Sequence, residues 1–202
     1  MASTQTDIMN RAITKLGALR IASPADDTKE ARELSSMWNA LRDNELRIRR
    51  WSFSLKRVLI AASTTVPAFG FTASYPLPTD CLRVIEINDI YATPDQSDYR
   101  NAPGQSYTIE GRNILTNGTG SLKLRYVSTS EDTAQWDSSF CEVFACRLAF
   151  EAAEALTQSA QRKSVAMQEY QMAIGAARRA NAIEQEPEYV ADDTWLLARL
   201  RG

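Results

Sequence analysis

Glycine and proline are concentrated in the middle of this chain, and their placement limits the folds that it can adopt. The sequence of 202 residues contains 8 glycines and 7 prolines, and ten of these 15 lie between residues 67 and 120. Both residues interrupt helices, so the flanks are free to form long helices, whereas the middle favours short strands joined by turns. The sequence therefore predicts an α+β fold in which an antiparallel β subdomain is inserted into an antiparallel bundle of four main helices.

Two helices are expected in the N-terminal flank. The first begins near Thr4, and Asp7 three residues later completes a plausible N-terminal capping pattern. Asp26 or Asp27 is expected to cap the second helix, which runs to about Arg49 with an apolar residue at every third or fourth position. The two segments predict a helical hairpin.

Two further helices are expected after the β region. Asp137 is a good capping residue for the third, and the fourth runs from about Arg162 to about Gln185, before Pro187. The apolar residues of the fourth helix fall on two faces, Val165, Met172, Ala176 and Ile183 on one and Tyr170, Ile174 and Ala177 on the other. One face can serve the core, and the second needs another partner such as a neighbouring subunit.

The middle of the chain is expected to form a three-strand meander. A buried strand is predicted at residues 82–90, and residues 92–105 form a polar loop. The meander follows at residues 107–109, 114–115 and 122–126, with turns at 111–113 and 117–120. Four segments follow from these patterns: a helical hairpin (1–50), a β-rich subdomain (51–135), a second helical hairpin (136–186) and a C-terminal docking tail (187–202).

The chain has no histidine, which excludes several kinds of catalytic site. Neither a Ser-His nor a Cys-His nucleophile pair can form, and a zinc site with a histidine ligand is impossible. Glu151 and Glu154 lie three residues apart on one predicted helix, where they form either a carboxylate pair for acid–base work or a solvated surface. We expect the solvated surface, and hence a structural protein that is not an enzyme and has no cofactor or metal.

Charge is nearly balanced overall but is distributed unevenly. The chain has 23 Lys and Arg against 25 Asp and Glu, yet residues 41–57 carry a net charge of +4 and residues 184–193 a net charge of −5. The basic residues of the first segment are Arg42, Arg47, Arg49, Arg50, Lys56 and Arg57. Three readings stay open: contacts to nucleic-acid phosphates with base stacking on Trp51 and Phe53, a solvated helix end, or a patch between subunits that faces the acidic tail of a neighbour.

The cysteines and the N-terminal sequence indicate a cytosolic setting for synthesis. Cys81, Cys141 and Cys146 are too few and too irregularly spaced for a disulfide framework, so we expect reduced thiols. The first twenty residues lack the apolar core of a signal peptide, and apolar runs are far shorter than the ~20 residues of a membrane span. A cytosolic chain without a membrane anchor is expected.

The last residues form an apolar segment with little chain around it. It consists of Trp195, Leu196, Leu197, Arg199 and Leu200 with their immediate neighbours, after an acidic stretch. Tryptophan and arginine dominate the hot spots of protein interfaces. We therefore expect this tail to dock onto another protein, the alternative being a tail folded back on its own helices.

Many short sequence matches, taken in order, resemble the head-to-tail adaptor proteins of tailed phages, a family also called tail tubular protein A in short-tailed phages. The N-terminal matches are Leu16-Gly17, Arg20-Ile21, Asp26-Asp27, Arg42-Asp43, Leu46-Arg47, Trp51 and Phe53. The later ones are Leu77-Pro78, Asp80 to Val84, Glu110-Gly111, Tyr126-Val127, Trp136-Asp137, Leu156 to Ser159, Tyr170 and Thr194-Trp195. Family members more usually carry serine at the position of Thr194.

The resemblance implies a subunit of a dodecameric ring in the virion, below the portal protein and around the channel for the genomic DNA. The C-terminal tail would grip the portal, and the β region would meet the next tail protein, a nozzle or tail tube. Arg42, Arg47, Arg49, Arg50, Lys56, Arg57, Tyr170 and Ile174 are candidates for the subunit interface or the channel wall. The alternatives are a carboxylate-based peptidoglycan hydrolase of the phage tail and a nucleic-acid-binding helical module.

Overall fold

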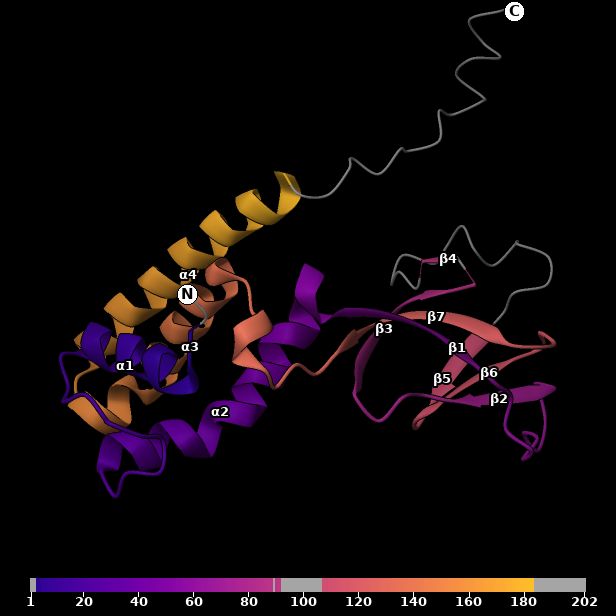
Figure 1. Cartoon of the computed structure of the whole chain (residues 1–202), viewed down its shortest axis with the longest axis horizontal. Helices are drawn as coiled ribbons and strands as arrows, with labels where there is room; N and C mark the ends of the chain where they lie inside the picture. The colour runs from indigo at the N-terminus through magenta and orange to yellow at the C-terminus, as the bar shows by residue number, and fades with distance from the viewer. Residues whose placement is uncertain (1–2, 89, 92–106, 184–202) are drawn as a thin grey trace, which may run out of the picture.

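The computed structural model describes residues 3–88, 90–91 and 107–183. Helices gather at one end of the molecule and strands at the other (Figure 1), which confirms the predicted α+β class. The helices are α1 (Gln5–Leu16), α2 (Lys29–Ile48), α3 (Ser138–Thr157) and α4 (Ala160–Ile183), with short 3-10 helices η1 (Ser52–Ser54) and η3 (Thr133–Gln135). The predicted loop 92–105 and the predicted tail 187–202 lie outside the described residues, and the four-segment division of the chain stays a prediction.

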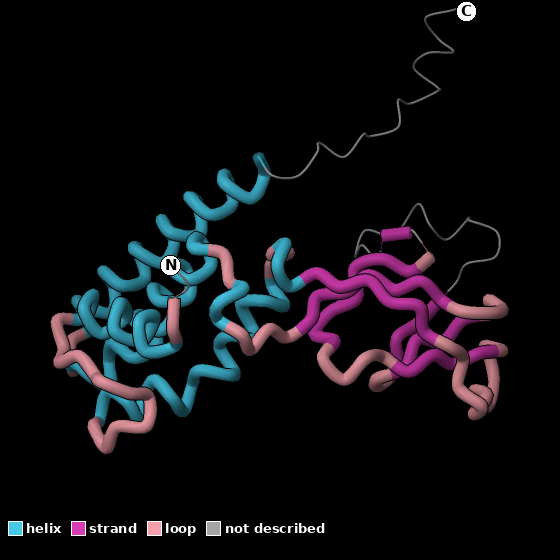
Figure 2. Tube along the Cα trace, in the orientation of Figure 1, coloured by secondary structure: helices cyan, strands magenta, loops and turns pink. Residues whose placement is uncertain are grey.

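In the part of the chain that the structure describes, seven strands form two antiparallel sheets (Figure 2). The strands are β1 (Leu55–Ile60), β2 (Ala73–Pro76), β3 (Cys81–Ile87), β4 (Ile90–Tyr91), β5 (Tyr107–Glu110), β6 (Asn113–Thr116) and β7 (Leu122–Ser128). The larger sheet has the order β1-β7-β3-β4, and the smaller has the order β2-β6-β5. Every pairing is antiparallel.

The predicted three-strand meander is wrong. β5 and β6 do form a hairpin, but β6 pairs on its other side with β2, and β7 lies in the other sheet between β1 and β3. The turn at residues 117–120, in which Gly120 has a φ of +85°, carries the chain from one sheet to the other. A turn signal shows where a chain reverses, not which strand it will meet, so the sequence pattern could not distinguish these pairings.

Helix α1 is defined by local signals at both ends. Thr4 accepts a hydrogen bond from the backbone N–H of Asp7 at 3.2 Å, and the Asp7 carboxylate accepts from the backbone N–H of Thr4 at 3.0 Å, so the predicted cap is confirmed as a capping box. Gly17 ends the helix in the left-handed conformation, with a φ of +68°. The guanidinium of Arg162, at the start of α4, donates to the carbonyl of Leu16.

Helix α2 begins later than its sequence suggested. Its N-cap is Thr28, whose hydroxyl accepts from the backbone N–H of Ala31 at 3.2 Å. Asp26 instead accepts from the backbone N–H groups of Ala22 and Ser23, and the Asp27 carboxylate pairs with Arg32 at 2.7 Å. Asp26 therefore stabilises a turn and Asp27 an ion pair, and neither caps the helix, because such local contacts compete with capping.

The helical core is built around α3. Phe140, Phe144, Leu148 and Ala152, which recur every four residues along one face of this helix, are buried, and α1, α2 and α4 all pack on α3. Six aromatic residues join its first half to the rest of the core: Trp38, Trp51, Phe53, Trp136, Phe140 and Phe144. The two N-terminal helices make their main contacts with α3 rather than with each other.

The two sheets enclose a second apolar core. Its buried residues are Tyr75, Cys81, Val84, Ile87, Ile114, Leu122, Leu124 and Tyr126. Alternation along β7 divides the strand between environments, because Leu124 and Tyr126 face this second core whereas Val127 belongs to the helical core. The molecule thus has a helical body and a β body, each with its own apolar interior.

Candidate functional site

Two arginines join the helical body to the β body. The guanidinium of Arg47, in the last turn of α2, donates to the carbonyl of Leu82 at 2.9 Å. In return the guanidinium of Arg83 donates to the carbonyls of Arg47 at 3.1 Å and Ile48 at 3.4 Å. Burial, with the nearby charges of Arg50 and Arg47, lowers the pKa of Arg83. These bonds satisfy the last carbonyls of α2 and fix the helix to β3.

A buried carboxyl group lies beside this junction. The side chain of Glu45 on α2 is fully buried and accepts hydrogen bonds from the hydroxyl of Tyr170 on α4 and from the guanidinium of Arg49. Burial, reinforced by the bond to Glu45, raises the pKa of Tyr170. Tyr170 is only 6% exposed and Ile174 packs against the same core, and the assignment of both to a subunit interface or the channel wall stays a prediction.

The predicted basic run is divided between the interior and the surface. Arg42 is buried and donates to the carboxylate of Asp43 at 2.9 Å and the hydroxyl of Thr129 at 3.3 Å, and Arg49 is held by Glu45. Neither side chain fits the reading of a solvated helix end. Trp51 is buried in an edge-to-face contact with Phe140, so it cannot stack on a base in this structure.

Lys56 also has an acidic partner, although its side chain is exposed. Its ammonium donates to the carboxylate of Asp80 at 2.7 Å, and the same carboxylate accepts from the hydroxyl of Tyr126 at 3.0 Å. Burial would raise the pKa of Asp80, but these two bonds lower it below the ordinary value. For Tyr126, burial and then the bond to Asp80 raise the pKa to about 12.

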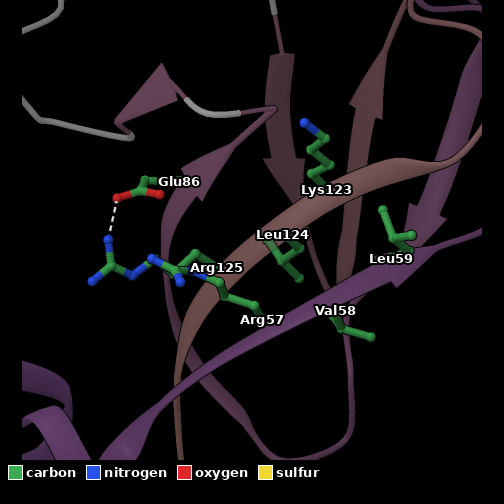
Figure 3. A pocket seen from close by; sticks show the side chains of 7 residues that line it. All are labelled: Arg57, Val58, Leu59, Glu86, Lys123, Leu124 and Arg125. Carbon is green, nitrogen blue, oxygen red and sulfur yellow. Dashed lines mark hydrogen bonds and ion pairs between the residues drawn. The ribbon is translucent and has the colours of Figure 1, made fainter.

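The outer face of the larger sheet is basic. We define this basic face as Arg57 and Leu59 of β1 with Lys123 and Arg125 of β7; together with Glu86 these side chains line a shallow hollow of about 270 Å³ (Figure 3). Arg57 lies directly across from Arg125 in the antiparallel register, and Arg125 pairs with Glu86 at 2.6 Å. Like charges in this position disfavour folding, so an anionic group placed here would relieve the repulsion.

An apolar stripe runs along the outside of α4. It consists of Val165, Met172 and Ala176, which lie on one helical face and are all exposed; Met172 is 66% exposed. This is one of the two faces predicted from the sequence, and the other, with Tyr170 and Ala177, is buried. The α4 stripe therefore has no partner among the described residues.

A second apolar feature lies at the far end of the β body, where no site was predicted from the sequence. The loop between β1 and β2 exposes Phe69 by 89% and Val66 by 63%, beside a hollow of about 590 Å³ bordered by Leu115 of β6. We call Val66, Phe69 and this hollow the apolar tip. Two phenylalanines flanking Gly70 in a turn-rich stretch were the available signal, because such a segment has too little chain to bury them.

The two carboxylates weighed as an acid–base pair each have a basic partner of their own. Glu151 binds Arg147 at 2.6 Å, and Glu154 binds Lys163 at 2.7 Å. The hydrogen bond and charge of Lys163 lower the pKa of Glu154, whereas a general acid needs a raised one. In the described ranges no three His, Cys, Asp or Glu side chains gather to hold a metal ion.

The cysteines are free thiols in the interior. Cys81, Cys141 and Cys146 are all buried, and burial raises the pKa of each, that of Cys146 to about 11. Such thiols react slowly. Among the helices that the structure describes, none has the length and apolar character needed to cross a membrane.

A family model described as SU10 adaptor protein matches residues 3–191, which is nearly the whole chain. The match includes both bodies and the start of the predicted tail. No curated protein matches the sequence.

Proposed function

Because the chain belongs to the SU10 adaptor protein family, a family of phage head–tail adaptors, we propose that it forms a homo-oligomeric ring, a dodecamer, between the portal and the tail. The family membership supports a structural role in the virion and carries the proposal. In this role the ring lines the channel through which the genomic DNA passes, and the chain is made in the host cytoplasm before assembly.

The α4 stripe is the feature that best suits the subunit contact. Val165, Met172 and Ala176 lie on the one apolar helix face that the helical body leaves uncovered in the described residues. Interfaces between identical subunits are richer in apolar contacts than the rest of the surface. In a ring each copy contributes the same patch to a different patch of its neighbour, and the rotation closes the assembly.

The apolar tip is our proposed contact with the next tail protein. It lies at the end of the β body farthest from the helices (Figure 1), so one copy can touch a tail component there while its helical body contacts the portal side. A phenylalanine exposed by 89% offers apolar area whose burial under a partner would stabilise the contact.

The C-terminal tail is our proposed contact with the portal, and its removal tests the proposal. Deleting residues 187–202 should leave a folded protein that no longer binds portal rings. The reason is that Trp195 and the leucines near it supply the apolar area, at about 1.5–3 kcal/mol for each fully buried side chain. Mass measurement of the purified protein alone and after mixing with portal rings gives the readout. Normal assembly of the truncated protein would contradict the role of the tail.

A single substitution separates docking from folding. Trp195→Ala should weaken attachment to the portal by more than it lowers the melting temperature of the free protein. The opposite pattern, with unchanged attachment and a large loss of melting temperature, would mean that the tail folds back on its own helices.

Purified protein should also fail to lyse peptidoglycan, and Glu151→Gln is the comparison. Lysis by the wild type that this variant lacks would overturn the structural role.

A further inference from the structure

We propose that the acidic segment at residues 184–193 of a second copy of the chain docks in extended form along β1, with its carboxylates on the basic face. The inference rests on the proposed homo-oligomer and names the partner of a surface that the α4 stripe does not involve. It joins two features: the unmatched Arg57 of β1 and the open edge of that strand.

The strand β1 lies at one end of the larger sheet. It pairs with β7 along Leu55–Ile60, and within the described ranges no strand pairs with its other side. The backbone groups on such an edge can accept an added strand from another chain. Lys56 and Arg57 stand on this edge, where charges discourage unselective pairing and favour a partner of opposite charge.

One cation of the basic face, Arg57, lacks an acidic partner among the described residues. Arg125 is matched by Glu86, and Lys56, which points to the opposite side of the sheet, is matched by Asp80. Arg57 is exposed and has no acidic partner among the described residues, although it lies directly across from Arg125. An incoming carboxylate placed between the two guanidinium groups would relieve their repulsion, at a surface where the side chain of Leu59 is 67% exposed.

The acidic segment has the matching chemistry. Residues 184–193 carry Glu184, Glu186, Glu188, Asp192 and Asp193 without a basic residue, and the apolar pair Tyr189 and Val190 lies between them. A polypeptide of this kind can cover Leu59 and also extend the sheet, whereas a nucleic-acid strand could satisfy only the cations. The exposed leucine and the open edge therefore favour an acidic peptide over DNA.

A second copy is the source that the charges favour. Every copy carries one basic face and one acidic segment, so pairing between neighbours leaves neither charge unmatched anywhere in a closed ring. Fully extended, the ten residues span at most about 35 Å, which is enough to leave the end of α4 and follow a six-residue strand of a neighbour.

Disulfide trapping between differently tagged full-length copies tests the inference. Leu59→Cys protein is mixed with Val190→Cys protein, and in parallel with Tyr189→Cys protein, under mild oxidation. The native cysteines are buried and should not interfere. We expect a covalent adduct between two copies, formed faster by one of the two tail variants because adjacent residues of a strand face opposite sides. Ile109→Cys, which is 43% exposed on the other sheet, serves as the control and should give no adduct.

Charge reversal shows whether the basic face directs the docking. Adding Arg57→Glu to the Leu59→Cys protein should lower the adduct yield roughly fivefold, the effect of losing one exposed ion pair of about 1 kcal/mol. Arg20→Glu, a reversal of an exposed arginine in the helical body, should leave the yield unchanged. Absence of any adduct with the wild-type charges overturns the inference, and so does a yield that is insensitive to Arg57→Glu.

Two further experiments test the other possible occupants of the basic face, which are the acidic segment of the same copy and duplex DNA. A single chain that carries both Leu59→Cys and Val190→Cys and closes only an internal disulfide, while the mixed copies form no adduct, would place the segment on its own copy and overturn the inference. Loss of duplex DNA binding in Arg57→Glu without change in the adduct would assign the face to DNA. Assembly of wild-type protein with portal rings is measured separately, so normal rings without an adduct refute the docking and leave the proposed function intact.

Discussion

At the scale of single residues, Glu45 shows how a buried polar group can hold helices together. Its carboxyl group on α2 is fully buried and accepts hydrogen bonds from the hydroxyl of Tyr170 on α4 and from the guanidinium of Arg49. The guanidinium of Arg147 on α3 lies 5.4 Å from the centre of the Tyr170 ring, so three helices meet at this group. A buried acceptor that loses its donor costs more free energy than a typical hydrogen bond contributes.

Tyr170→Phe is expected to lower the free energy of unfolding by about 1.5–3 kcal/mol, because it removes a hydrogen bond to a buried acidic group. Urea denaturation followed by circular dichroism measures the change. Met172→Ala, on the exposed side of the same helix, should change the value by less than about 0.5 kcal/mol and serves as the control. Equal losses in the two variants would mean that Tyr170 contributes only general packing.

The titration of Asp80 gives a second prediction at this scale. Its bonds to Lys56 and Tyr126 lower its pKa below the ordinary value of 3.8, so the ionised form stabilises the fold above the unfolded pKa. That contribution should disappear as the pH falls through the lower, folded pKa. The free energy of unfolding, measured by denaturation between pH 6 and pH 2, should therefore fall less with decreasing pH for Asp80→Asn than for the wild type. The same pH dependence of the free energy of unfolding in both proteins would contradict a stabilising role for ionised Asp80.

At the scale of elements, helix ends were the features that the sequence predicted best. Thr4 and Asp137 act as caps at the expected places, because a capping side chain and its target lie within three residues. Pairings between strands were predicted poorly, since β6 and β7 are neighbours in sequence but belong to different sheets. β1 was missed because its two consecutive cations, Lys56 and Arg57, mask the alternation that marks a strand.

For the site residues too, features set by nearby sequence could be predicted, and features set by distant partners could not. The uncovered face of α4 could be predicted from its periodicity, but not which of its two apolar faces would be buried. That choice depends on Glu45, whose carboxylate accepts a hydrogen bond from the hydroxyl of Tyr170 although the two residues are 125 apart in the sequence. The burial of Arg42 could not be predicted either, because its partner Thr129 lies just after β7, 87 residues away in the sequence.

Two glycines in helical surroundings should respond to the same substitution with opposite signs. Gly17→Ala places a side chain at a φ of +68°, with its Cβ 2.8 Å from the Arg162 guanidinium, and should destabilise the protein by about 1–2 kcal/mol. Gly175→Ala lies inside α4 with open space around it and should stabilise by about 0.5–1 kcal/mol. Thermal denaturation of both variants measures the contrast; a stabilising Gly17→Ala would mean that the helix end relaxes freely.

At the scale of the whole molecule, the exposed apolar features lie at separate places on the two bodies. The α4 stripe runs along the helical body, and the apolar tip lies at the far end of the β body. The arginine pair Arg47 and Arg83 fixes one body to the other, so contacts made at one end have a defined geometry at the other. This arrangement suits a part that connects two different neighbours.

Met172→Asp in the α4 stripe should abolish self-association without unfolding the chain. A charge at the centre of an apolar contact loses its hydration when the contact forms, which costs several kcal/mol. Sedimentation velocity in the presence of portal rings reports the association, and circular dichroism reports the fold. Gln171→Asp, exposed and one residue away on a different face, is the matched control. Unchanged assembly of Met172→Asp would place the subunit contact elsewhere.

The two separate cores also set an order of events during synthesis. The β core uses residues from Val58 to Tyr126, a continuous stretch that can close once β7 has left the ribosome. The helical core joins Ile8 and Leu34 to Phe144, so the apolar faces of α1 and α2 that pack on α3 stay uncovered until α3 is translated, about 90 residues after α2. The nascent chain therefore carries a finished β body after two helices whose α3-facing surfaces are still bare, and it is in this interval that chaperones would be needed most.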